Sequence, residues 1–242
     1  MSPLPTIVLV HGSWADSSSW NPVIPRLLDR GYSVLTVPNL LRGLGGDAAY
    51  VAAALAQRTS GPVVLVGHSY GGAVISSAAL GGGDVRALVY IDAFIPDEGE
   101  TVLSLVGDSG SALAVPDPTT ILDLVAFPGA AEGDADAYLK ESTVHESFAQ
   151  DLPELDRNLI FATQRPGALA ANVTPATAAA WRSIPSWALI GTEDRIIPPA
   201  LQRRMAERAN ATILETPAGH VSMFSAPDVV AGVIVAAAES IG

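Results

Sequence analysis

Short runs of continuously apolar, β-branched residues alternate along the chain with longer stretches rich in alanine and leucine. The apolar runs end in Gly, Pro or Asp and predict strands at 6–10, 33–37, 62–66, 86–91, 186–190 and 211–215. Between the strands, helices are predicted at about 17–30, 47–58, 69–80, 198–209 and 226–240. Strands that are apolar on both faces are typical of a parallel sheet covered by helices on each side. The predicted fold class is therefore doubly wound α/β, with a mostly parallel six-stranded sheet.

One interval interrupts this alternation. Residues 96–185 form a stretch of about ninety residues, rich in Asp, Glu, Pro and Gly, in which no core strand is evident. An insertion of this length is usually a functional lid or a binding segment. We therefore expect residues 1–95 and 186–242 to form an α/β core and residues 96–185 to form a helical cap, all within one domain. The cap helices are predicted at about 118–126, 134–149 and 151–163.

Composition narrows the classes of function. The 242 residues carry 25 acidic and 13 basic side chains, a formal net charge of −12, which argues against a nucleic-acid partner. The chain has no cysteine, so thiol nucleophiles, disulfides and thiolate metal sites are excluded. The longest apolar run, residues 229–238, is shorter than the roughly 18 residues that indicate a membrane span, so no membrane partner is expected. Residues 1–5 lack the pattern of a signal peptide, and we expect a cytoplasmic protein.

The strongest local motif is Gly-His-Ser-Tyr-Gly at residues 67–71, between a predicted strand and an Ala-rich helix. This context is typical of a nucleophile elbow, in which a sharp strand-to-helix turn projects the serine hydroxyl above the sheet. Small residues are needed two positions to either side of the serine, and Gly67 and Gly71 occupy them. Ser69 is therefore the candidate nucleophile.

A serine hydroxyl needs a general base within hydrogen-bond reach. The chain has four histidines, of which His11 follows the first strand, His68 lies in the strained turn and His145 lies in the insertion. His220 lies in the last loop before the final helix, where the α/β-hydrolase order of serine, acid and histidine places the base. We predict that His220 is the base.

The acid that orients the base should follow a strand between the serine and the histidine. Asp194 meets this condition in the loop after the strand at 186–190 and is the predicted acid. Glu193 and Asp92 are competing candidates. Asp92 is the stronger rival, because it directly follows the strand at 86–91 and a triad acid can occupy that position in this fold.

An oxyanion hole requires two N–H donors, one of them from the residue after the nucleophile and the other from a loop after an earlier strand. Tyr70 supplies the first position, and the sequence His-Gly-Ser-Trp at residues 11–14 supplies the loop. Ser13 is predicted to contribute the second N–H. Trp14 is predicted to line the substrate pocket.

Other chemistry is not indicated. Residues 43–48 match a loose G-x-G-x-x-A dinucleotide pattern, but the strand that follows ends without the acidic residue that would hold a ribose. The chain contains no P-loop, and His145-Glu146 lacks the second histidine of a zinc H-E-x-x-H motif. No cofactor and no metal are therefore expected.

With these residues identified, the chain resembles the α/β-hydrolases over nearly its whole length. More narrowly, it resembles the cofactor-free branch that contains plant methyl esterases, hydroxynitrile lyases and many small bacterial relatives. The resemblance rests on LVHGSW, VGHSYGG, ALVYIDAFIPDEGE, GTEDRIIPP and AGHVSMFSAPDVV. It implies a parallel core and a helical cap folded over Ser69.

One departure within this branch favours hydrolysis. The lyases that resemble this chain usually carry a lysine directly after the base histidine and a threonine after the histidine of the first strand. Here these positions hold Val221 and Gly12. We therefore predict a serine hydrolase that cleaves a small carboxylic ester or lactone through an acyl-enzyme. A cofactor-free C–C lyase, of hydroxynitrile or retro-aldol type, and a ligand-binding receptor of the same fold are the alternatives.

The expected partner is a small-molecule substrate. Acidic side chains recur through the insertion and predict an acidic cap exterior and a neutral, partly apolar substrate. They are Asp97, Glu98, Glu100, Asp117, Asp123, Glu132, Asp134 and Asp136. Aromatic side chains of the insertion suggest an apolar pocket, although aromatics at helical spacing more often form the core of a cap. They are Phe127, Tyr138, Phe148, Phe161 and Trp181.

Overall fold

The centre of the fold is a sheet of six strands in the order β2-β1-β3-β4-β8-β9, every neighbouring pair of which is parallel. The computed structural model describes residues 4–242. The strands are β1 (Thr6–Val10), β2 (Ser33–Val37), β3 (Pro62–His68), β4 (Asp84–Ile91), β8 (Ser186–Gly191) and β9 (Thr212–Thr216). The predicted six-stranded parallel sheet is confirmed.

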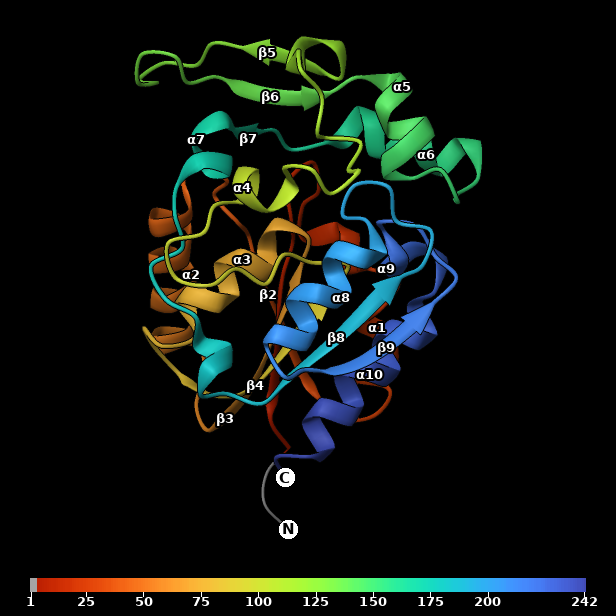
Figure 1. Ribbon diagram of the computed structural model, residues 1–242. Helices are drawn as coiled ribbons and strands as arrows, with labels where there is room; N and C mark the ends of the chain where they lie inside the picture. Colours follow the sequence, from red (N-terminus) through yellow and green to blue (C-terminus); the bar gives the residue numbers. More distant parts are fainter. Residues whose placement is uncertain (1–3) are drawn as a thin grey trace.

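Helices cover both faces of this sheet (Figure 1). The helices α2 and α3 pack against each other, as do α1 and α10. The bounds are α1 (Ile24–Leu28), α2 (Leu44–Arg58), α3 (Tyr70–Ala78), α8 (Pro199–Arg208), α9 (Ser222–Ser225) and α10 (Pro227–Glu239). The single helix predicted over 17–30 is wrong. A 3-10 helix, η1 (Ser17–Trp20), ends before Pro22, which has no N–H to donate, and α1 then begins separately with Pro25 in its first turn.

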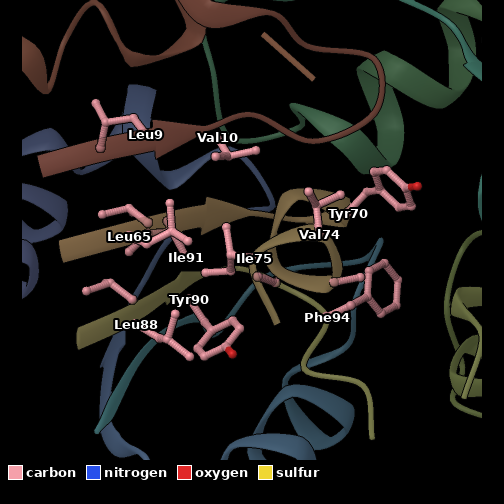
Figure 2. Close-up of a cluster of buried hydrophobic side chains, with 14 of the residues drawn as sticks. Leu9, Val10, Leu65, Tyr70, Val74, Ile75, Leu88, Tyr90, Ile91 and Phe94 are labelled. Atoms are coloured by element: carbon pink, nitrogen blue, oxygen red, sulfur yellow. The ribbon is translucent and has the colours of Figure 1, made fainter. Parts of the chain in front are cut away.

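One cluster of the core lies between the central strands and α3 (Figure 2). Side chains of β1, β3 and β4 pack against Val74 and Ile75 of α3, and all of them are fully buried. Burial of each such aliphatic side chain contributes about 1.5–3 kcal/mol. A buried hydrogen bond of 3.0 Å between Ser76 and Tyr90 adds a polar contact between α3 and β4. This packing fixes the point at which β3 ends and α3 begins.

Residues 96–185 separate β4 from β8 along the chain, and their greater part lies over one end of the six-stranded sheet (Figure 1). We call them the inserted segment. It contains a second, antiparallel sheet in the order β5-β6-β7. Its elements are α4 (Val102–Val106), η2 (Pro118–Thr120), β5 (Leu122–Val125), β6 (Asp136–Leu139), α5 (Glu141–Thr143), η3 (Val144–Phe148), α6 (Glu154–Thr163), β7 (Gly167–Ala168), α7 (Leu169–Val173) and η4 (Ala180–Arg182).

The expectation of a purely helical insertion is wrong in two places. The helix predicted over 118–126 is a 3-10 turn followed by β5, and the first part of the helix predicted over 134–149 is β6. In β6, Ala137 and Leu139 are fully buried while Asp136 and Tyr138 are half-buried, which is the two-residue period of a strand. The helix predicted over 151–163 is present as α6, which begins after Pro153.

Within residues 4–242, no helix is both long enough and apolar enough to cross a membrane.

Candidate active site

Ser69 occupies the turn between β3 and α3 in a strained conformation. Its φ of +53° lies in the left-handed region that favours glycine. A Cβ atom on Gly67 would lie 2.5 Å from the carbonyl oxygen of Gly71, and one on Gly71 would lie 2.6 Å from the carbonyl oxygen of Val10. These two approaches explain why the turn admits only glycine at both positions. The geometry is that of a nucleophile elbow.

A continuous chain of hydrogen bonds joins Ser69, His220 and Asp194. The Ser69 hydroxyl lies 2.9 Å from Nε2 of His220, and Nδ1 of His220 lies 2.8 Å from Oδ2 of Asp194. His220 is fully buried, and burial lowers its pKa to about 3, so the imidazole is neutral at pH 7. A neutral imidazole whose Nδ1–H donates to the carboxylate presents a free Nε2 lone pair to the hydroxyl.

The loop after β8 and the helix that follows it, α8, supply hydrogen-bond donors to Asp194. Its Oδ1 accepts from the backbone N–H groups of Ile196 at 2.8 Å and Ile197 at 2.9 Å, and its Oδ2 accepts from the Gln202 side-chain amide at 2.8 Å. Burial raises the pKa of Asp194, while these hydrogen bonds lower it. Because all of these donors are N–H groups, the carboxylate acts as an acceptor and holds the His220 ring in one orientation.

Asp92, the rival candidate acid, makes its hydrogen bonds to backbone groups rather than to His220. It follows β4 with a φ of +44° and is fully buried. Its carboxylate accepts from the backbone N–H of Gly191 at 2.7 Å and from that of Ser222 at 3.3 Å. Burial raises the pKa of Asp92, and the nearby charge of Asp194 raises it further. Asp92 thus ties together the backbones of the two loops that carry Asp194 and His220.

The loop at residues 11–14 presses against the candidate nucleophile. A Cβ atom on Gly12 would lie 2.6 Å from Cβ of Ser69 and 3.2 Å from its Oγ, so only glycine allows this approach. Ser13 follows directly and is buried. Tyr70 begins α3, and the first N–H groups of a helix have no partner within it. The backbone amides of Ser13 and Tyr70 therefore belong to the two segments that flank Ser69.

Two buried histidines, His11 and His68, hydrogen-bond the backbone of loops around the site. Nε2 of His11 accepts from the backbone N–H of Asn39 at 2.9 Å, and burial lowers the pKa of His11 to about 4. Nε2–H of His68 donates to the carbonyl oxygen of His220 at 2.9 Å, and burial lowers the pKa of His68 as well. Both rings are neutral, and they position the loops rather than carry charge.

Trp14 connects the core to the inserted segment. Its backbone N–H donates to Arg165 O and its indole N–H to Ala137 O, both at 2.9 Å, and its ring meets Phe148 edge-on with centroids 6.0 Å apart. Phe148 also packs on His220, with centroids 5.2 Å apart. Trp14 lines a cavity of about 40 Å³ beside His68 and a second cavity of about 520 Å³ in the inserted segment.

The larger cavity is mainly aliphatic. Apart from Trp14, its lining comes entirely from the inserted segment: Val102, Leu103, Val106, Leu113, Pro118, Ile121, Leu122, Ala131, Glu132, Gly133, Asp134, Leu169, Ala170, Asn172 and Val173. None of the aromatic side chains singled out in the insertion takes part. Phe127, for example, lies under the Arg42 guanidinium, 4.6 Å from it.

Within residues 4–242, no group of three or more His, Asp or Glu side chains is arranged to hold a metal ion.

The fold and this site define the class of α/β-hydrolases. Residues 7–233 match the model of the alpha/beta hydrolase family, and the chain belongs to that family. Among curated relatives, a carbendazim hydrolyzing esterase of Nocardioides sp. is 33% identical over 111 residues, which cover 41% of this chain and 46% of that protein, less than half its length. A pyrethroid hydrolase of Sphingobium wenxiniae is 26% identical over 92% of this chain and 83% of that protein.

Solved structures share the fold over the full length. A pyrethroid hydrolase from Sphingobium faniae superposes with a TM-score of 0.77 at 23% identity, covering 98% of each chain. A methylesterase from Arabidopsis superposes with a TM-score of 0.75 at 16% identity, covering 98% of this chain and 99% of that one. The predicted resemblance to small bacterial hydrolases and plant methyl esterases is confirmed.

Proposed function

We propose that this chain is a serine esterase that cleaves a neutral, apolar carboxylic ester or lactone through an acyl-enzyme. The observation that carries the proposal is the hydrogen-bonded series from Ser69 through His220 to Asp194, with donor–acceptor distances of 2.9 and 2.8 Å. The relatives named as a carbendazim hydrolyzing esterase and a pyrethroid hydrolase support the same reaction class.

In the first half of the reaction, Ser69 Oγ attacks the ester carbonyl carbon and its proton passes to Nε2 of His220. The negative charge that develops on the carbonyl oxygen is stabilised by the backbone N–H groups of Ser13 and Tyr70. Asp194 stabilises the imidazolium and keeps its Nε2 directed at Ser69. As the tetrahedral intermediate collapses, the alkoxide leaves with the proton from Nε2, and the acyl group remains on Ser69.

In the second half, water replaces the alcohol. Nε2 of His220 takes a proton from the water as its oxygen attacks the acyl carbon, and the same two N–H groups hold the oxyanion. Collapse of the second tetrahedral intermediate returns the proton to Ser69 Oγ and releases the carboxylic acid. The reaction therefore consumes one ester and one water, yields one alcohol and one acid, and restores the enzyme.

The inserted segment, residues 96–185, acts as a cap in this proposal and selects the substrate. Its aliphatic cavity of about 520 Å³ suits an apolar acyl or alcohol group, and Trp14, from the loop at residues 11–14, contributes to its lining. Glu132 and Asp134 also line the cavity and disfavour an anionic group there. The acidic cap exterior is partly neutralised, because Asp97 pairs with Arg182 and Glu100 with Arg208.

The position that follows the base supports hydrolysis over C–C cleavage. Val221 is buried beside His220 and lines the small cavity next to His68. An apolar side chain there offers no charge to a departing cyanide or enolate.

Labelling of the nucleophile tests the proposed function. A fluorophosphonate probe should form a covalent adduct at Ser69, identified by peptide mass spectrometry, in protein that hydrolyses p-nitrophenyl butyrate. A protein that turns over no ester and takes no label at Ser69 would contradict the proposal. A label at another serine would show that Ser69 is not the nucleophile.

Substrate charge provides a separate prediction. We expect kcat/KM for p-nitrophenyl butyrate to exceed that for mono-p-nitrophenyl succinate by about tenfold, since a carboxylate entering the cavity meets Glu132 and Asp134. Glu132→Gln should narrow the difference by raising only the rate with the succinate ester. Glu98→Gln, an exposed change outside the cavity, is the matched control. Equal kcat/KM values for the two esters in the wild type would remove the preference for neutral substrates.

A further inference from the structure

Two consecutive side chains of the inserted segment reach the loops that carry the proposed acid and base. Gln150 Nε2–H donates to the carbonyl oxygen of Glu193 at 2.8 Å, and Glu193 directly precedes Asp194. Oδ2 of Asp151 accepts from the backbone N–H of Gly219 at 2.7 Å, and Gly219 directly precedes His220. The two residues therefore bind the backbone one position before the acid and one position before the base.

Gly219 packs directly against these two side chains, and a larger residue there would have to displace their ends. A Cβ atom there would lie 2.5 Å from Oδ1 of Asp151 and 2.8 Å from Nε2 of Gln150. Oδ1 of Asp151 and Oε1 of Gln150 are buried and have no hydrogen-bond partner within residues 4–242.

The charge of Asp151 acts on His220 together with the other polar groups around this imidazole. Asp194, in the loop after β8, hydrogen-bonds Nδ1 of His220, and His68, at the end of β3, donates to the carbonyl oxygen of His220. Asp92 accepts from the backbone N–H of Ser222, two residues further along the chain. Asp151 is the charged group of the inserted segment that acts on the imidazole, and its charge raises the pKa of His220 against the effect of burial. A nearby negative charge favours the imidazolium that forms when the base takes a proton.

We propose that Gln150 and Asp151 form a positioning clasp, which fixes the acid and base loops at the separation that the triad requires while the Asp151 carboxylate stabilises the imidazolium form of His220. This inference rests on the proposed function and adds two positioning residues to it. Because the clasp belongs to the inserted segment, the triad is fully positioned only when this segment is packed against the two loops. A second tie supports that dependence, because Arg195, next to Asp194, donates to the carbonyl oxygen of Glu146 at 2.6 Å.

Substitution of Asp151 separates the two roles. Asp151→Ala removes the hydrogen bond and the charge, whereas Asp151→Asn keeps an oxygen that can accept from Gly219 and loses only the charge. We expect Asp151→Ala to lower kcat for p-nitrophenyl butyrate by about 10- to 100-fold, with KM changed less than threefold. Asp151→Asn should lie between Asp151→Ala and the wild type. The rate of fluorophosphonate labelling at Ser69 should fall in parallel with kcat, since it reports the nucleophile without ester binding.

Glu154→Gln is the matched control, because it removes one exposed negative charge from the same region. It should keep the kcat and the labelling rate of the wild type. Thermal unfolding of every variant establishes that the compared proteins are folded, and the near-isosteric Asp151→Asn provides the comparison if Asp151→Ala does not fold.

The kinetic constants of these variants can contradict the proposed clasp. It fails if Asp151→Ala matches Glu154→Gln within twofold in kcat, or if the loss lies in KM alone. Wild-type kcat in Asp151→Asn would overturn the role of the charge, and a loss equal to that of Asp151→Ala would overturn the role of the hydrogen bond. If Ser69→Ala is inactive while Asp151→Ala is unimpaired, the clasp fails and the esterase function stands. If the wild-type protein neither hydrolyses esters nor takes the label, the function itself fails.

Discussion

Replacing Ser69 by alanine should lower kcat for a p-nitrophenyl ester by at least about 10³-fold. The variant loses one oxygen atom, the one that lies 2.9 Å from Nε2 of His220. Neither the elbow nor the adjoining loops need to move, because alanine fits wherever the serine Cβ fits. KM should change little, since the attack on the carbonyl carbon is lost rather than the cavity that holds the ester. Steady-state kinetics with p-nitrophenyl butyrate, together with the loss of fluorophosphonate labelling, measure the effect.

Ser77→Ala is the matched control for this experiment. Ser77 lies in α3, the helix that follows Ser69, and its hydroxyl donates to the carbonyl oxygen of Ala178 at 3.3 Å. It should retain wild-type kcat. Equal rates in wild type and Ser69→Ala would end the assignment of Ser69 as nucleophile, whatever the control shows.

Replacing Asp194 by asparagine should lower kcat by about 10⁴-fold. The asparagine oxygen can keep the two hydrogen bonds from Ile196 and Ile197, so its amide nitrogen takes the place of Oδ2. That N–H₂ group then faces Nδ1 of His220, which can pair with it only by accepting. The imidazole proton moves to Nε2, and the ring can no longer take the proton of Ser69.

Asp92→Asn decides between the two candidate acids. The amide oxygen of the new side chain can still accept from the Gly191 N–H, and the hydrogen bond to His220 Nδ1 comes from Asp194, so we expect kcat to fall less than tenfold. Both variants are measured with the same ester, after thermal unfolding has established that they are folded. A larger loss of kcat in Asp92→Asn than in Asp194→Asn would reverse the assignment of the acid.

The fold was predictable where local sequence and long-range packing agree. The core strands are apolar on both faces because helices cover both sides of the sheet, and all six appear where the pattern placed them. In the inserted segment this agreement is lost. In strand β5 only Leu122 is buried and the other residues are exposed, so burial does not alternate along this strand as it does along β6. The helix expected over 17–30 failed because Pro22 interrupts it.

The sequence by itself determined the parallel sheet and the order in which Ser69, Asp194 and His220 follow three of its strands. Parallel strands place their carboxyl ends at one edge, so residues 125 and 26 positions apart in the chain must come near each other there. Strand order alone does not distinguish Asp92 from Asp194 as the acid, because each follows a strand that ends at that edge.

Only the tertiary structure decided which carboxylate reaches His220. The loop after β8 supplies two backbone N–H donors to Asp194, and Gln202 of α8 supplies a third, so that its Oδ2 lies at Nδ1 of His220. The carboxylate of Asp92 instead accepts from the backbone N–H groups of Gly191 and Ser222. The contact of Asp151 with Gly219 likewise joins positions 68 residues apart. Such contacts depend on how loops and side chains pack after the strands have paired, and no periodicity along the chain encodes that packing.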